Sequence, residues 1–215
     1  MITLYYSPNA CSMAPHIALE EAGASFEARP VYLRKGQHKE PWYLAINPNG
    51  QVPTLVVDGV PLTQNVAILT WIGRAHPEAG LLPSFASPME EAQFLSLLAW
   101  LASSVHPAFG QQFAAPRLID DATERERFVA RARAASEANL ARIDRMLAGK
   151  EYAFGRFSVA DAYLFVFLHW AKNAFAYDLS PYPNYVAHRE RLLARPAVQR
   201  VLAREQEAMA ASDAG

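Results

Sequence analysis

The segment from Tyr5 to Ser12 contains the side chains best suited to chemistry. It reads Tyr-Tyr-Ser-Pro-Asn-Ala-Cys-Ser, and Cys11 is the only cysteine among 215 residues. A thiol at the N-terminus of a helix lies near unpaired backbone N–H groups and the positive end of the helix dipole, which both favour a thiolate or another anion. The sequence therefore predicts a sulfur-centred reaction at Cys11, and a small buried hydrophobic residue is the alternative.

Hydroxyl and imidazole groups are the other candidates for catalysis. Tyr5 and Tyr6 alternate faces on a predicted strand, so only one can point toward the thiol. Ser12 could act on an anion or cap the helix. His106 could hold a thiol ionised or carry a proton, with a histidine packed at a helix break as the alternative. The remaining histidines lack the spacing of metal ligands, so we predict no metal site.

Composition narrows the class of protein. The 20 basic and 21 acidic side chains nearly balance, and no basic stripe with aromatic residues appears, so we expect no nucleic-acid partner. The longest apolar run, Ala162 to Leu168, is far shorter than the roughly 20 residues of a membrane span. The first residues lack the pattern of a secretory signal. A single cysteine suits a reducing compartment, so we expect a cytoplasmic protein without membrane contact.

The first 80 residues consist of short segments separated by proline and glycine. We expect a strand, a helix, a strand and a helical turn at residues 2–6, 11–22, 26–33 and 41–46. This order indicates a βαβ unit with parallel strands. Strands at 54–57 and 60–63 flank Asp58-Gly59, a strong hairpin signal, and Pro61 marks an edge strand. A helix follows at 66–75, with Gln64 or Asn65 close to its N-cap.

Residues 87–215 have long helical periods, and residues 77–88 form a linker. We expect helices from Met89 to about His106-Pro107, over 120–147, from Ser158 to about Lys172, from Asn184 and from Pro196. Ser158 and Asp161 match a capping box, so Asp161 is interpreted as structural. The helix that follows is apolar nearly all round and should lie at the centre of a bundle. The fold class is thus an α/β first domain (βαβ-ββα) and an all-α second domain.

Four stretches together resemble the cytosolic glutathione S-transferases. They are Ala10-Cys11-Ser12, the run from Asn47 to Pro53, Val66-Ala67-Ile68 and the run from Phe157 to Phe165. Cys11 together with His106 is similar to the bacterial beta class. The resemblance covers essentially the whole chain. It implies a thioredoxin-like domain over 1–80, a helical domain over 87–215, a homodimer and a role in detoxification.

The resemblance also implies a role for particular residues. Val52 would pair its backbone with the cysteinyl unit of glutathione, and Pro53 would be cis. Gln64 and Asn65 would bind the γ-glutamyl end, although Asn65 is bulkier than the usual residue. The full set implied to bind glutathione is Cys11, Lys35, Gln51, Val52, Pro53, Gln64, Asn65, Ser103 and His106. Those that could act on its thiol are Cys11, Tyr6, Ser12 and His106.

A small apolar electrophile is the implied second substrate. Residues that could line its pocket, with core packing as the alternative for most, are Trp100, Ser103, Phe109, Phe113, Tyr163 and Trp170. Two other functions stay open. One is a glutathione-dependent disulfide or peroxide reductase that uses Cys11. The other is a non-catalytic binding module, which Asn65 and Ala99 favour because they depart from the family pattern.

Overall fold

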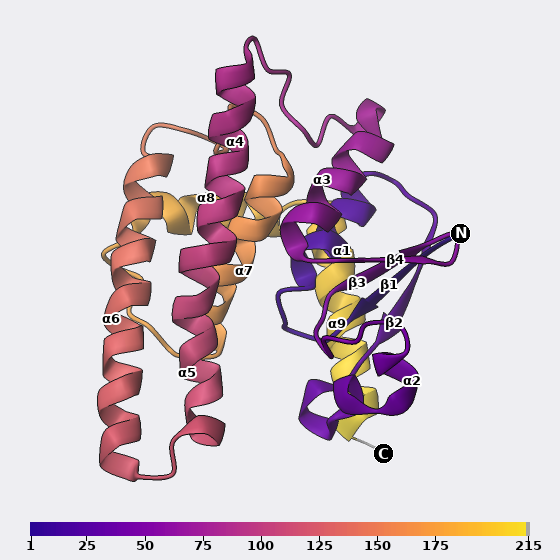
Figure 1. Ribbon diagram of the computed structural model, residues 1–215. Coiled ribbons are helices and arrows are strands. Elements are labelled where there is room, and N and C mark those ends of the chain that lie inside the picture. The colour runs from indigo at the N-terminus through magenta and orange to yellow at the C-terminus, as the bar shows by residue number, and fades with distance from the viewer. Residues whose placement is uncertain (214–215) are drawn as a thin grey trace.

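The computed structural model describes residues 1–213 and places a four-stranded sheet beside a group of long helices (Figure 1). The strands are β1 (Ile2–Tyr6), β2 (Phe26–Pro30), β3 (Thr54–Val57) and β4 (Val60–Thr63), in the order β2-β1-β3-β4. The β1–β2 pair is parallel and the other two pairs are antiparallel. The expected βαβ unit and hairpin are therefore confirmed.

Helix α1 (Met13–Glu21) joins β1 to β2 and begins two residues after Cys11. Strand β2 ends at Pro30, shorter than predicted, because the chain then forms two single-turn 3-10 helices, η1 (Leu33–Lys35) and η2 (Gln37–Lys39). A short helix, α2 (Pro41–Leu44), completes this connection. The crossover from β2 to β3 thus begins at the carboxyl end of the parallel pair β1 and β2, the same end from which the Cys11 turn leaves.

Strand β4 is the edge strand that its proline predicts. Pro61 lies opposite Val56 of β3 and needs no ladder hydrogen bond on its outer side. Helix α3 (Asn65–Ala75) follows directly, with Gln64 as its N-cap residue, and a 3-10 turn, η3 (Pro77–Ala79), leads to the second part of the chain. The start of α3 thus lies beside the turn that carries Cys11, between β1 and α1.

The helix expected to end near His106-Pro107 continues to Leu118, so that part of the prediction is wrong. Helix α4 (Pro88–Trp100) passes through a π-helical turn, η4 (Leu101–Val105), into α5 (His106–Leu118). The His106 N–H donates to the carbonyl of Leu101, five residues back. Pro107 occupies the first turn of α5, where proline is tolerated, and does not stop the helix.

The remaining helices are α6 (Ala122–Leu147), α7 (Val159–Asn173), α8 (Pro183–Leu193) and α9 (Pro196–Asp213). Helix α7 is buried along nearly its whole length, as expected for the centre of the bundle. The Asp161 carboxylate accepts from the N–H groups of Ser158 (2.8 Å) and Ala153 (2.9 Å) and lies 2.9 Å from His188 Nε2. These contacts match the structural role predicted for Asp161.

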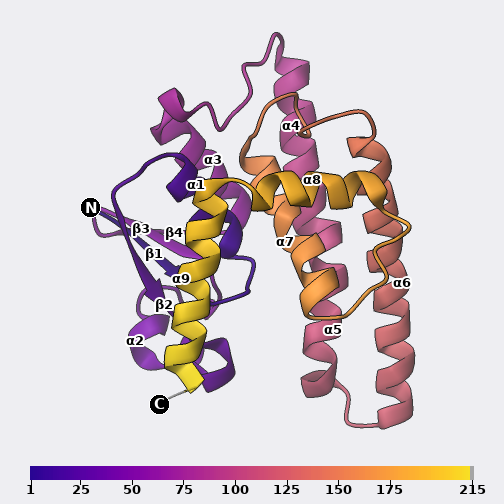
Figure 2. The same ribbon diagram turned by 180° about the vertical axis from the view of Figure 1, so that it is seen from behind.

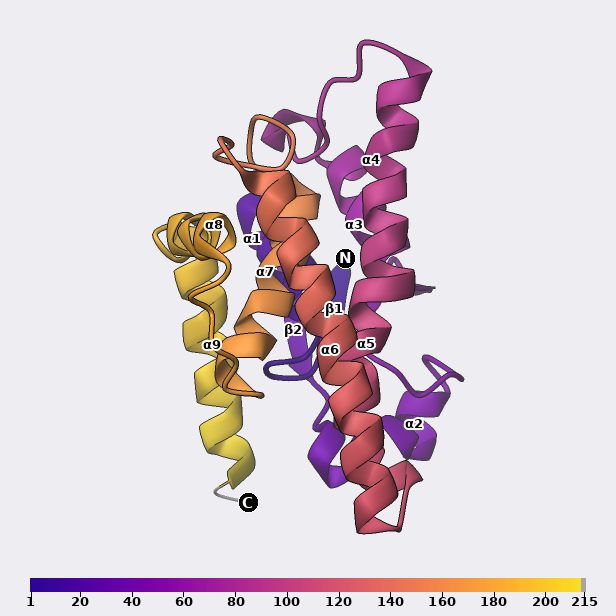
Figure 3. The same ribbon diagram turned by 90° about the vertical axis from the view of Figure 1, so that its left-hand side faces the viewer.

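Helix α9 returns to the first part of the chain and packs along α1, as seen from behind (Figure 2). Arg195 binds Glu21 at 2.5 and 2.8 Å, and Arg200 and Arg204 bind Glu20 at 2.7 and 2.8 Å. Viewed from the side of α6, helix α7 lies in front of α1 and the strands (Figure 3). Both helices therefore join the two parts of the molecule. Among residues 1–213, no helix is long and apolar enough to cross a membrane.

Candidate functional site

Cys11 lies in the turn between β1 and α1, beside the segment that leads into β3. Its side chain is largely buried, and Sγ lies 3.4 Å from the carbonyl oxygen of Val52, to which it donates. The peptide bond between Val52 and Pro53 is cis, as the resemblance implied. The fold therefore brings Cys11, Val52 and Pro53 together across about forty residues of sequence.

The expectation of a thiolate at Cys11 is wrong for this geometry. Burial raises the pKa of the thiol to about 12, and the negative charge of Glu205 adds to the shift, against hydrogen bonds from Asn65 and the backbone of Cys11 and Ser12. Helix α1 begins only at Met13, and the lost hydration of a thiolate outweighs the nearby N–H groups. Cys11 is thus a neutral S–H donor at neutral pH.

Asn65 extends from the start of α3 toward the cysteine turn. Its Nδ2 donates to the carbonyl of Cys11 at 3.2 Å, and its Oδ1 is buried without a partner. Gln64 is the N-cap residue of α3, within the expected pair, although no side-chain hydrogen bond caps the helix. A buried acceptor without a partner costs about 1–3 kcal/mol. Asn65 therefore offers an unused acceptor close to the thiol.

Gln64, the residue before Asn65, has a positive φ angle, which few residues other than glycine adopt. Its φ is +73°, which is unfavourable for a residue with a Cβ, and its side chain is exposed. Such strain, on the order of 1–3 kcal/mol, persists only where the surrounding structure imposes it. The position at the N-terminus of α3 gives Gln64 access to a ligand held there.

His106 on α5 is joined to Tyr163 on α7. Its Nδ1 lies 3.0 Å from the Tyr163 hydroxyl, and its ring centre lies 5.2 Å from that of Trp170. Burial lowers the pKa of His106 to about 4, so the ring is neutral at neutral pH and cannot hold a thiolate by charge. Burial raises the pKa of Tyr163. The negative charge of an ionised Cys11 would raise it further, whereas Asn65 lowers it. The Tyr163 hydroxyl is therefore the side-chain hydrogen-bond partner of His106.

The hydroxyls of Tyr6 and Ser12 point into the protein. Ser12 Oγ accepts from the N–H of Ser7 at 3.0 Å and donates to its carbonyl at 3.1 Å, so it neither caps α1 nor faces the thiol. The Tyr6 ring packs 4.8 Å from that of His16, and burial raises its pKa to about 12. The structure therefore does not group these two hydroxyls with Cys11 and His106.

The loop before Pro53 is held by residues that the sequence did not single out. The carbonyl of Gln51 accepts from the Tyr43 hydroxyl at 2.6 Å and from Asn47 Nδ2 at 2.8 Å. Asn47 opens the Asn-Pro-Asn-Gly turn, whose Asn is a known turn former, and this was the available signal. These bonds fix the backbone that carries Val52.

Two lysines lie near this loop. Lys35 is exposed, with Nζ 5.8 Å from the centre of the Tyr32 ring. Lys39, which sequence reasoning missed, has its Nζ 2.9 Å from where a Cβ on Gly50 would lie. That Cβ would also lie 2.7 Å from the carbonyl of His38, so only glycine fits there. Lys39 is therefore a second cation beside the loop.

The predicted second-substrate residues divide into two groups. Phe113 is 42% exposed and packs against Trp170 at 5.3 Å and Phe175 at 4.5 Å. Phe109 and Tyr163 lie deeper in the same aromatic cluster and are buried. Together with His106, these side chains form an apolar wall, to which Phe167 and Phe175, two residues that the sequence did not single out, also belong.

Two residues lie apart from this wall. Trp100 packs under Arg142 of α6, whose guanidinium carbon lies 4.2 Å from the ring centre. It lines a cavity on that side of α4. Ser103 is exposed in the π-helical turn, close in sequence to His106. The structure thus does not group Trp100 with the other aromatic residues.

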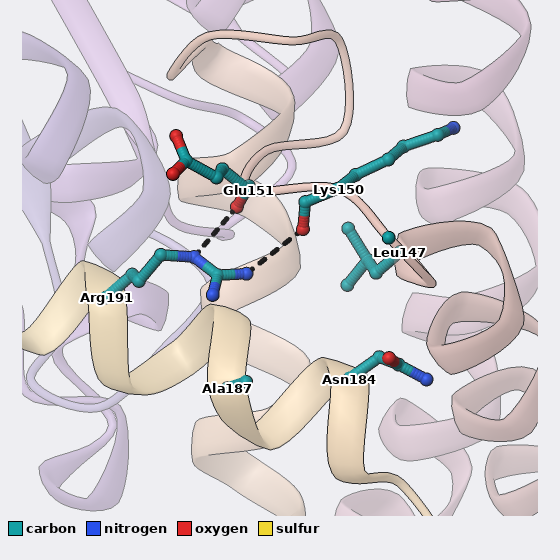
Figure 4. Close-up of a pocket in the computed structure, with 7 residues that line it drawn as sticks. Leu147, Lys150, Glu151, Asn184, Ala187 and Arg191 are labelled. Carbon is teal, nitrogen blue, oxygen red and sulfur yellow. Dashed lines mark hydrogen bonds between the residues drawn. The ribbon is translucent and has the colours of Figure 1, made fainter.

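The cavity shown in Figure 4 has a volume of about 290 Å³ and lies between α6 and α8. Arg191 crosses it and donates to the carbonyls of Glu151 and Lys150, both at 3.1 Å. This cation already has partners, and none of the predicted site residues lines the cavity. Within residues 1–213 no three His, Cys, Asp or Glu side chains gather as ligands for a metal ion.

Comparison with protein families matches both parts of the chain. Residues 1–74 match the N-terminal domain of glutathione S-transferase, and residues 124–191 match its C-terminal domain. The glutathione S-transferase GstA of Escherichia coli O157:H7 is 34% identical over 205 residues, which cover 94% of this chain and 98% of that protein.

Solved structures agree with this match. A beta-class glutathione S-transferase of Sphingomonas chungbukensis superposes with a TM-score of 0.82 at 39% identity, over 94% of this chain and 98% of its own. A sphingomonad glutathione S-transferase complexed with glutathione also gives a TM-score of 0.82 at 39% identity, over 95% and 98% of the two chains.

Proposed function

The chain belongs to the glutathione S-transferase family and is a glutathione transferase, and from this premise we propose that it conjugates the thiol of glutathione to small apolar electrophiles beside Cys11 and His106. The contact between Cys11 Sγ and the carbonyl of Val52 supports this proposal most directly. A cysteinyl unit that pairs with the backbone of Val52 has its sulfur close to Cys11. Glutathione is bound in a related sphingomonad structure of the same fold.

The two ends of glutathione find complementary groups on either side of Val52. The N-terminus of α3 offers free backbone N–H groups and the positive end of a dipole to the γ-glutamyl carboxylate. The Asn65 Oδ1, which is buried without a partner, is available to the neighbouring ammonium group. Lys35 and Lys39 lie where either can attract the glycyl carboxylate.

Cys11 acts as a hydrogen-bond donor in this proposal and is not the nucleophile. Because its pKa is raised to about 12, its S–H persists at neutral pH and can donate to the sulfur of a bound glutathione thiolate. A hydrogen bond to the charged form lowers the pKa of the glutathione thiol. The thiolate then attacks an electrophile that the site holds nearby, and proximity supplies much of the rate.

His106 relays the proton that leaves the glutathione thiol to solvent and does not retain it, because burial lowers its pKa to about 4. The ring is neutral, and in the tautomer in which Nδ1–H donates to Tyr163, Nε2 remains an acceptor. The electrophile lies against Phe113, Phe175 and Trp170, whose packed rings favour apolar and aromatic compounds. Attack forms the thioether bond and breaks the bond to the leaving group, such as chloride, which departs with the electron pair, while the displaced proton passes to solvent.

A glutathione-dependent reductase is the second candidate, favoured by the position of Cys11 beside the expected sulfur. Its thiol would attack glutathione disulfide, form a mixed disulfide and release one glutathione. This step needs a Cys11 thiolate, which burial disfavours. The relatives that carry the name transferase favour the enzyme over a non-catalytic module. We further propose a homodimer that works in the cytoplasm.

Two assays test the function. Calorimetric titration should show glutathione binding, and mass spectrometry should show the dinitrophenyl thioether when 1-chloro-2,4-dinitrobenzene is added. A His106→Asn variant should bind glutathione but conjugate it about 10²-fold more slowly. The absence of both binding and product at millimolar glutathione would refute the proposal. Reduction of hydroxyethyl disulfide that depends on Cys11 would instead support the reductase.

A further inference from the structure

Asn9, two residues before Cys11, is held by the second part of the chain. Its φ of +58° places it in the left-handed region, where an asparagine is tolerated. Its N–H donates to Glu205 Oε2 (2.7 Å), and its carbonyl accepts from Trp170 Nε1 (2.7 Å). Its side-chain oxygen lies 3.1 Å from His169 Nε2, and its side-chain nitrogen lies 2.9 Å from Met209 Sδ. The turn that carries the thiol is therefore fastened to α7 and α9.

Glu205 is the buried member of this set. It is 1% exposed, and its second oxygen, Oε1, lies 3.4 Å from His16 Nδ1 on α1. Arg204 donates to His16 Nε2 at 2.8 Å, so Nε2 is the acceptor and Nδ1 carries the hydrogen that points at Glu205. The carboxylate thus accepts one hydrogen bond from the cysteine turn and one from the helix that follows it.

A carboxylate suits this position for a physical reason. Burying it is costly unless its oxygens are hydrogen-bonded, and both donors belong to the thioredoxin-like part of the chain. A side chain with a single acceptor atom could satisfy only one of them. Glu205 therefore holds Asn9 and α1 in a fixed position relative to each other. It does so from a helix that is almost two hundred residues away in sequence.

We propose that Glu205 is a positioning residue of the glutathione site, which holds the Cys11 turn in place through the N–H of Asn9. The proposal rests on the proposed function, because this turn matters for transfer only where the sulfur of glutathione lies at Cys11. Loss of the hydrogen bond lets the turn move relative to Val52. A displaced turn contacts the cysteinyl unit of glutathione less closely, which weakens its binding and raises KM.

The charge of Glu205 provides a second readout at the thiol. Burial is the main cause of the raised pKa of Cys11, and Glu205 raises it further, as it does for Tyr6. Replacing Glu205 by Gln keeps an acceptor for the Asn9 N–H but removes the charge, so the Cys11 pKa should fall. The other titratable groups around Glu205 and the turn are Tyr6, His16, Glu20, Tyr32, Tyr163, His169, Arg204 and Glu207.

The test compares three variants. Glu205→Ala removes both acceptor and charge, Glu205→Gln removes the charge, and Glu207→Gln is the control, since Glu207 is exposed on the same helix. We expect Glu205→Ala to raise KM for glutathione about tenfold, with a smaller change in kcat. We expect Glu205→Gln to be alkylated at Cys11 by iodoacetamide severalfold faster than wild type at the same pH, and the control to behave as wild type.

Wild-type KM and alkylation rates in both Glu205 variants would overturn the proposal. Hydrogen exchange in the wild type tests it independently of whether the variants fold, because the Asn9 amide should be protected although the Asn9 residue is exposed. Fast exchange there would also overturn it. The alkylation assay needs no glutathione, so failure of the wild type to bind glutathione would refute the proposed function alone.

Discussion

The Cys11 thiol is surrounded by groups that act differently on its two charge states. Burial and the negative charge of Glu205 both disfavour the thiolate, whereas hydrogen bonds from Asn65 and from the backbone favour it. The first effect dominates and leaves a neutral S–H that donates to Val52. A buried neutral thiol is a poor nucleophile and a suitable donor to another sulfur. This asymmetry assigns the nucleophilic role to glutathione.

The reactivity of Cys11 should follow its raised pKa. We predict that alkylation by iodoacetamide in the absence of glutathione rises about tenfold per pH unit through the neutral and alkaline range, since only the thiolate reacts. Mass spectrometry of the modified protein measures the rate, with Cys11→Ser as the blank. A plateau near neutral pH would show that Cys11 is ionised and would favour the disulfide chemistry of a reductase.

Tyr163→Phe should expose the contribution of the hydroxyl at His106. Its removal leaves a buried ring nitrogen without its partner at 3.0 Å, and we expect a loss of about 1–3 kcal/mol in the free energy of unfolding. We expect kcat to fall more than KM for glutathione changes, because the tautomer of His106 is no longer fixed. Urea denaturation and steady-state kinetics measure both. Unchanged kcat would separate His106 from proton transfer.

The strained backbone of Gln64 makes stability and binding change in opposite directions. Gln64→Gly should stabilise the fold by up to about 1 kcal/mol, because glycine adopts a φ of +73° without a Cβ clash. The same change should raise KM for glutathione, since the amide side chain is lost. Thermal unfolding and kinetics of this variant, with Gln64→Ala as the comparison, test the prediction. A stabilised variant with unchanged KM would remove Gln64 from the site.

At the scale of the elements, the predictable features were those that rest on local chemistry. Asp58-Gly59 indicated the hairpin and Pro61 the edge strand, because turn and ladder requirements act within a few residues. Helix α5 was missed because the preceding helix was expected to end near His106-Pro107. The π-helical turn before it accommodates Pro107, and the burial of Phe109 in the aromatic cluster is a tertiary effect that periodicity over a few residues does not reveal.

The features of the site also divide into those that local sequence predicts and those that tertiary contacts determine. The sequence motifs identified Cys11, Val52 and His106, and the structure brings Cys11 and Val52 into contact. The pKa of Cys11 could not be predicted, because burial, a tertiary effect, is its main cause, and two groups that modify it, Asn65 and Glu205, lie on α3 and α9, far away in sequence. The inward direction of Ser12 depends on its bonds to Ser7, which compete with capping in a way that residue type alone does not decide.

The N-terminus of α7 should be the most sensitive structural point among the helices. The Asp161 carboxylate is fully buried and joins Ser158, Ala153 and His188. We predict that Asp161→Ala lowers the free energy of unfolding by about 3–5 kcal/mol, because its partners lose a charged acceptor inside the bundle. The exposed Asp178→Ala is the matched control and should cost less than about 1 kcal/mol. Equal effects in urea denaturation would contradict this role.

At the scale of the whole molecule, two helices hold the thioredoxin-like part against the bundle. Helix α7 packs on α1 and contributes Trp170 and His169 to the cysteine turn, and α9 packs along the same helix. Cys11 lies on one part and His106 on the other. The geometry of the site therefore depends on how firmly the two parts are joined.

Acid should lower the free energy of unfolding of the folded chain. Burial lowers the pKa values of His106 and His169 to about 4 from about 6.5 in the unfolded chain. The unfolded state then binds more protons between these values, so the stability is present above pH 6.5 and is lost as the pH falls toward 4. We predict a loss on the order of 2 kcal/mol or more between pH 7 and pH 5. Urea denaturation at both values measures it, and an unchanged midpoint would contradict buried, neutral histidines.

The central claim is that the neutral Cys11 thiol stabilises the thiolate of a bound glutathione. The most direct measurement is the ultraviolet thiolate absorbance of glutathione bound to the wild type and to Cys11→Ala, titrated against pH. We predict a bound-thiol pKa at least one unit below the usual value of about 8.5 in the wild type, and a return toward that value in the variant. A bound glutathione whose pKa is the same in both proteins would contradict the claim.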